Sequence, residues 1–164
     1  MAERSVIHDT FTIERTYPAT PGRVFAAFAS EEAKDAWGDT EEAESAVGPA
    51  GEAAPSEFDF RVDGRERYSH IYAGKTYRYD GRYYDIVPDQ RIIYSYEMYA
   101  DDVRISVSVT TIEFAKVAEG TALTFTEQGV YLDGIDGPQA PALREEGIGE
   151  MLDGLTAYLT AAAD

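Results

Sequence analysis

The chain has 164 residues, contains no cysteine and carries a formal net charge of −17. This length suits one domain with a sizeable core, and so large a negative charge repels nucleic-acid phosphates and anionic membrane surfaces. No apolar run approaches the roughly 18 residues that cross a bilayer, and the first residues lack the layout of a signal peptide. We therefore expect a cytoplasmic protein with no disulfide, no membrane span and no nucleic-acid partner.

The first predicted elements are one strand and two short helices. Residues 11–17 alternate apolar and polar side chains, as a half-buried strand does. Thr20 and Pro21 form a helix start, in which a capping side chain precedes a proline at the first helical position. A second short helix is predicted to begin after Ser30, with acidic residues in its first turn, and to end near Trp37.

Residues 38–56 form the least regular part of the sequence. They are rich in Gly, Ala, Glu and Pro and show no periodicity of apolar side chains. This composition predicts a long, flexible acidic loop. The loop could cover a cavity or could be an insertion without a role, and the sequence favours neither.

A succession of strands joined by short links follows the loop. Asp63-Gly64 predicts a two-residue hairpin turn. Gly81 predicts a bulge or a close approach of two backbones. The change of apolar phase between Val109 and Ile112 predicts a further bulge. Short links favour an antiparallel meander. The six strands predicted here cover residues 58–62, 65–72, 77–87, 92–98, 103–114 with the bulge inside it, and 123–127.

The C-terminal segment has helical periodicity. Apolar residues from Leu143 to Leu159 recur at helical spacing, which predicts an amphipathic helix of roughly five turns lying on the sheet. Gly147, Gly149 and Gly154 interrupt this helix, and each costs about 1 kcal/mol relative to alanine. They indicate either a close backbone approach or tolerated looseness.

Nine of the twelve tyrosines lie between Tyr68 and Tyr99. Aromatic residues suit a pleated, half-buried surface, and a buried tyrosine hydroxyl usually needs a partner. The stretch is therefore either a packed core or the wall of a pocket for a semi-polar molecule.

Several segments, in the same order along the chain, resemble one known superfamily. They are residues 11–15, 21–28 and Trp37, residues 60–65, residues 81–88 with 91–97, residues 120–126 and residues 152–159. Together they resemble the START-like (SRPBCC) superfamily, in the branch homologous to the C-terminal domain of the activator of heat-shock protein 90 ATPase. By this resemblance, residues 1–164 form a single bacterial START-like domain.

The resemblance implies an α+β helix-grip fold. Such a fold has a curved antiparallel sheet of about seven strands wrapped around a long C-terminal helix, with two short helices after strand one. It also implies a cavity between sheet and helix for hydrophobic or amphipathic small molecules, and it brings no catalytic motif. The chain departs from the family pattern at Glu127, where histidine is frequent, at Ile148, where tryptophan is frequent, and in the acidic residues 39–52.

Strand phase and the resemblance together select the side chains expected to line this cavity. An inward carboxylate is costly unless it is paired, so Glu127 is assigned a ligand-binding or polar-network role. His70 is either a locally bonded residue of the sheet or an acid/base group oriented by Glu66 or Glu127. The ligand-binding candidates are Trp37, Phe60, Glu66, Tyr68, His70, Tyr83, Tyr94, Tyr96, Phe125, Glu127, Ile148, Met151, Leu152 and Leu155.

Three functions follow from these residues and from the resemblance. The first is binding of a small hydrophobic or amphipathic ligand, aromatic ligands included. The second is a cyclase- or dehydratase-type enzyme that uses His70 or Glu127 as acid/base. The third is a chaperone-interaction module. One usable histidine and no cysteine fit zinc poorly, and no phosphate or dinucleotide fingerprint is present, so neither metal nor cofactor is expected. Exposed strand edges are compatible with a homodimer.

Overall fold

The computed structural model describes residues 4–38, 44–45 and 56–161. The helices are α1 (Pro21–Ala29), α2 (Glu31–Gly38) and α3 (Ala140–Ala161). The strands are β1 (Val6–Tyr17), β2 (Glu44–Ser45), β3 (Glu57–Phe58), β4 (Arg65–Tyr72), β5 (Lys75–Val87), β6 (Arg91–Ala100), β7 (Val103–Val117) and β8 (Gly120–Leu132). The predicted loop 38–56 lies mostly outside the described residues.

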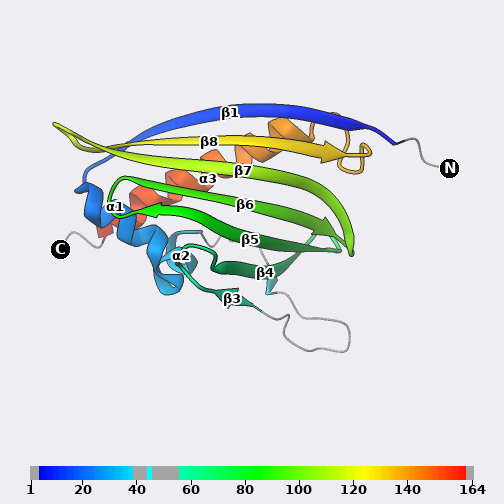
Figure 1. Cartoon of the computed structure of the whole chain (residues 1–164), viewed down its shortest axis with the longest axis horizontal. Helices are drawn as coiled ribbons and strands as arrows, with labels where there is room; N and C mark the ends of the chain where they lie inside the picture. Colours follow the sequence, from blue (N-terminus) through cyan, green and yellow to red (C-terminus); the bar gives the residue numbers. More distant parts are fainter. Residues whose placement is uncertain (1–3, 39–43, 46–55, 162–164) are drawn as a thin grey trace.

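One curved antiparallel sheet and one long helix dominate the architecture (Figure 1). The long strands are ordered β1-β8-β7-β6-β5-β4, and the two-residue strands β2 and β3 both pair with β4. Figure 1 shows α3 behind the sheet, with α1 and α2 at one end of it. The predicted α+β helix-grip fold is thereby confirmed. None of the described helices combines the length and the apolarity that a bilayer crossing requires.

Tight turns hold neighbouring strands in register. Ala73 and Gly74 have φ angles of 51° and 80°, and Asp101 and Asp102 have φ angles of 48° and 68°. Positive φ at both central residues is the geometry of the hairpin turn that matches the right-handed twist of strands. The meander from β4 to β7 therefore has two links that the local sequence specifies.

The predicted strand over residues 58–62 is wrong beyond Phe58. Strand β3 contains only Glu57 and Phe58, and the next residues turn back, with the Gly64 amide donating to the Arg61 carbonyl at 2.8 Å. A Cβ atom at Gly64 would lie 2.1 Å from the carbonyl oxygen of Asp59. This close packing makes residues 59–64 a compact turn, and Asp63-Gly64 is no two-residue hairpin.

Strand β7 runs without the bulge predicted between Val109 and Ile112. From Ser106 to Val117 it pairs with β8 without a shift of register, and the irregularity in its pairing with β6 falls at the start of the strand. After the buried Ile105, the buried residues of its first half are Ser106, Ser108 and Thr110, whereas Val109 is 42% exposed. The apolar phase changes because the inward face is polar there, and not because the backbone is irregular.

Gly81 marks a close approach, and the bulge predicted there as an alternative lies elsewhere. A Cβ atom at Gly81 would lie 2.8 Å from a ring carbon of Tyr79, whereas the register of β5 and β6 shifts between Tyr83 and Asp85. The absent side chain of Gly81 leaves room for the Tyr79 ring to lie over the strand.

Helix α3 extends over 22 residues and packs on the sheet through its C-terminal half. Leu152, Leu155 and Leu159 are buried, whereas Leu143, predicted on the same apolar face, is 58% exposed. The hydroxyl of Tyr17 donates to the carbonyl of Leu152 at 2.8 Å, which ties β1 to the helix. In the N-terminal half of α3, Ala140 is buried and Ile148 lines the cavity described below, so Leu143 lies on the opposite, exposed face of the helix.

Candidate ligand-binding cavity

A cavity of about 790 Å³ lies between the sheet and helices α2 and α3. All but two of the predicted binding residues line it: Trp37, Phe60, Glu66, Tyr68, His70, Tyr83, Tyr94, Tyr96, Phe125, Glu127, Ile148 and Met151. The two exceptions, Leu152 and Leu155, are fully buried in the hydrophobic core. They pack in the core beside the cavity and do not line it.

Tyrosine rings form one wall of the cavity across three strands. Tyr68 of β4 stacks on Tyr79 of β5 with ring centroids 4.7 Å apart, and Tyr79 stacks on Tyr96 of β6 at 4.8 Å. Tyr83 meets Tyr94 edge to face at 5.8 Å. The sequence between Tyr68 and Tyr99 was compatible with a packed core or with a pocket wall. It contributes to both, because Tyr79, Tyr83 and Tyr96 are buried and also line the cavity.

Glu127 of β8 is the centre of a buried polar cluster. Its Oε1 accepts hydrogen bonds from the Tyr96 hydroxyl at 2.7 Å and from the Thr110 hydroxyl at 3.0 Å. Its Oε2 lies 3.5 Å from Nη1 of Arg144. The carboxylate is 1% exposed, and a buried charge of this kind requires a counter-charge and hydrogen bonds.

Arg144 of α3 supplies that counter-charge. Its guanidinium donates to the Tyr96 hydroxyl at 2.8 Å and to the Ser106 hydroxyl at 2.9 Å. It also lies 5.3 Å from the ring centroid of Tyr131, a cation–π distance. The sequence reasoning missed Arg144, although the unusual Ser-Val-Ser-Val-Thr run of β7 was a signal that a polar group faces this part of the sheet.

The environment changes the protonation behaviour of the cluster. Burial raises the pKa of Glu127 above its ordinary value, while the Arg144 charge and the hydrogen bonds act in the opposite direction. Burial also raises the pKa of the Tyr96 hydroxyl well above its ordinary value. Tyr96 therefore stays protonated at neutral pH and acts as a hydrogen-bond donor.

A second buried carboxylate, Glu66, also belongs to the cavity lining. Both oxygens of Glu66 lie 2.7 Å from Nζ of Lys34 on α2, and the Tyr83 hydroxyl donates to Oε2 at 2.8 Å. Burial, together with the neighbouring carboxylate, raises the pKa of Tyr83 far above its ordinary range. Lys34, the sole base between Glu31 and Asp59, was not among the predicted site residues.

His70 lines the cavity but is not held by either carboxylate. It is half-buried and stacks on Tyr77 with ring centroids 5.6 Å apart, and burial lowers its pKa. The expectation that Glu66 or Glu127 orients it is wrong, because the hydrogen bonds of both carboxylates go to other residues. An acid/base pair around His70 is therefore not assembled in this structure.

Trp37 combines core packing with a place at the cavity. Its indole Nε1 donates to the Ala27 carbonyl at 2.8 Å, and its ring meets Phe28 edge to face at 4.9 Å. Phe28 and Trp37 also belong to the cavity lining. The indole is thus both part of the cavity wall and anchored in the fold by its hydrogen bond and its contact with Phe28.

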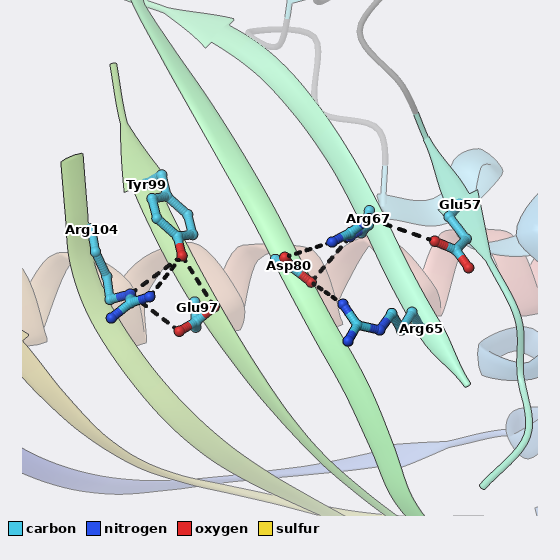
Figure 2. Close-up of polar contacts among 7 residues, drawn as sticks. All are labelled: Glu57, Arg65, Arg67, Asp80, Glu97, Tyr99 and Arg104. Atoms are coloured by element: carbon cyan, nitrogen blue, oxygen red, sulfur yellow. Dashed lines mark hydrogen bonds and ion pairs between the residues drawn. The ribbon is translucent and has the colours of Figure 1, made fainter. Parts of the chain in front are cut away.

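The outer face of the sheet carries polar groups of a different kind. Figure 2 shows Asp80 between Arg65 and Arg67, and Arg104 beside Glu97 and Tyr99, with the helix behind the strands. Arg67 Nε lies 3.3 Å from Asp80 Oδ1, and Arg104 Nε lies 3.1 Å from Glu97 Oε1. Exposed pairs of this type contribute little, typically about 0–1 kcal/mol each. Within the described residues no three His, Asp or Glu side chains converge as a metal site would.

The sheet, the gripping helix and the cavity between them define a START-like protein. The sequence model described as "Activator of Hsp90 ATPase homolog 1-like protein" matches residues 18–160, and the chain belongs to this family. No curated protein matches the chain.

Solved structures share this fold over nearly the whole chain. The Mll3558 protein of Rhizobium loti is 44% identical, with a TM-score of 0.79, over 94% of this chain and 99% of its own. A protein of Rhizobium leguminosarum is 39% identical, with a TM-score of 0.81, over 97% of this chain and 99% of its own. The AHSA1 (SPO3351) protein of Silicibacter pomeroyi, 19% identical with a TM-score of 0.72 over 94% of this chain and 99% of its own, agrees in fold.

Proposed function

We propose that the protein binds a small amphipathic molecule in the cavity between the sheet and α3. The observation that carries this proposal is the cavity itself, about 790 Å³ in volume, with aromatic and aliphatic walls and two buried polar clusters. Ligand sites commonly have roughly 300–1,000 Å³ of space, a mostly apolar lining and a few converging polar groups. The cavity has each of these properties.

The arrangement of the polar residues supports binding ahead of catalysis. Glu127 is paired with Arg144, and Glu66 is paired with Lys34. A general acid or base must reach a reacting group with a proton that it can exchange, whereas these carboxylates are already engaged by cations. Polar groups fixed in this way are suited to orienting a ligand.

A fluorescence titration tests the proposal. The neutral probe N-phenyl-1-naphthylamine, which brightens in apolar surroundings, is titrated with the wild-type protein and with Ile148→Trp. Ile148 lines the cavity, so an indole there fills space that the probe would use. Leu143→Trp places the same side chain on the exposed surface of the same helix and is the matched control.

We expect micromolar probe binding by the wild type and by Leu143→Trp, and binding at least about tenfold weaker by Ile148→Trp, the effect of a lost apolar contact and a steric block. Probe binding that is absent in all three proteins, or equal in all three, would contradict the proposal.

A further inference from the structure

One buried acceptor atom of Glu127 has an ionic neighbour but no hydrogen-bond donor among the described residues. Oε2 of Glu127 is buried and accepts no hydrogen bond from the described residues, although Glu127 belongs to the cavity lining. Arg144 Nη1 is 3.5 Å away, but the hydrogen bonds of the guanidinium go to the hydroxyls of Tyr96, Ser106 and Ser108. An unsatisfied buried acceptor is a costly arrangement that most proteins avoid.

We infer that the ligand carries an alcohol or phenol hydroxyl, which donates its hydrogen bond to Oε2 of Glu127. This inference rests on the proposed function and narrows the ligand to one chemical class. Oε1 already accepts two hydrogen bonds, from Tyr96 and Thr110, so the free acceptor position is at Oε2. A group that only accepts hydrogen bonds, such as a ketone or an ether, leaves it unpaired.

The charges at the site select a neutral donor. Glu127 and Arg144 are formally balanced at a separation of 3.5 Å. A ligand ammonium would lie against the Arg144 guanidinium, and a ligand carboxylate would lie against Glu127, so each would face repulsion in a site of low dielectric constant. A hydroxyl introduces no net charge, and its oxygen can also accept from the adjacent guanidinium.

A matched pair of probes measures this selectivity. 2-Naphthol and 2-methoxynaphthalene share one aromatic body, but only 2-naphthol has a hydroxyl donor. Each is used to displace N-phenyl-1-naphthylamine from the wild type, from Glu127→Gln and from Glu97→Gln. Glu97 is on β6 beside Tyr96, and its carboxylate binds Arg104 and Tyr99 on the outer face (Figure 2), so Glu97→Gln makes the same change away from the cavity.

We expect wild type and Glu97→Gln to prefer 2-naphthol over 2-methoxynaphthalene by about tenfold or more, the usual effect of a hydrogen bond to a charged group. In Glu127→Gln the preference should fall to about twofold or less, because the amide can donate equally to the hydroxyl oxygen and to the ether oxygen.

Each other outcome has a distinct meaning. If the fluorescent probe binds but both naphthalenes displace it equally from the wild type, the hydroxyl inference is overturned and the proposed function stands. If the preference persists in Glu127→Gln, the assignment to Glu127 is overturned. If no probe binds the wild type, the proposed function fails and the inference fails with it. The wild-type comparison decides the inference even where Glu127→Gln does not fold.

Discussion

Two opposing effects act on the protonation of the Glu127 side chain. Burial favours its neutral form, and Arg144 together with the Tyr96 and Thr110 hydroxyls favours its charged form. Because burial is the largest of these influences and raises the pKa, the folded protein holds the carboxyl proton more tightly than the unfolded chain does. A pH-dependent contribution to stability follows from this difference.

The direction of that contribution can be measured. The stabilising contribution of Glu127 is fully present below its ordinary pKa of 4.5. This contribution is lost as the pH rises through the raised pKa of Glu127 in the folded protein. We expect the free energy of unfolding of the wild type to fall relative to that of Glu127→Gln between about pH 4 and pH 7, by at most about 1.4 kcal/mol per pH unit.

Urea denaturation at a series of pH values gives the two free energies, and Glu97→Gln corrects for the loss of one negative charge on the outer face. A difference that rises with pH would show that the Arg144 charge outweighs burial.

Single residues were predictable where one strand face determined their environment. Alternation along β6 and β8 indicates that Tyr94, Tyr96 and Glu127 share the inner side of the sheet, and all three line the cavity. Arg144 was not predictable in this way, since its neighbours Glu145 and Glu146 indicate a solvated helix face. Its inward position depends on Ser106 and Ser108, which the sheet brings to it from a distant part of the chain.

Among the elements, strand β7 shows most clearly how the structure differs from what the sequence predicts. A run with valine outward and serine inward reverses the usual pattern of a sheet covered on one face. The reversal follows from the presence of an arginine over the strand, which requires hydroxyl partners. A change of apolar phase within a strand can therefore indicate a buried polar site as well as a bulge.

The glycines of α3 differ in what their surroundings permit. A Cβ atom at Gly154 would lie 2.9 Å from the carbonyl oxygen of Trp37, whereas at Gly147 it would meet no atom within 4 Å. Gly154→Ala should therefore lower the free energy of unfolding by about 1–3 kcal/mol through overpacking. Gly147→Ala should raise it by about 0.5–1 kcal/mol through helix propensity.

Urea denaturation midpoints of the two variants measure this contrast, and each variant is the control for the other because both make the same change in the same helix. Equal shifts of the two midpoints would mean that the contact between α3 and the end of α2 does not limit their approach.

At the scale of the whole molecule, the sheet separates two kinds of polar chemistry. Its outer face carries exposed ion pairs such as Arg67 with Asp80 (Figure 2). Its inner face carries a few buried polar groups within an aromatic lining. The order of the elements was predictable because each strand and helix has its own periodicity. The volume of the cavity was not, since it depends on how far the N-terminal half of α3 stands from the sheet.

A crystal structure of the protein grown with N-phenyl-1-naphthylamine will show whether this space holds a ligand. We expect electron density for the probe between the sheet and α3, in contact with Tyr94 and Ile148, which both line the cavity. A cavity closed by its own side chains, with the probe absent or bound on the outer face of the sheet, would mean that the space is not a binding site.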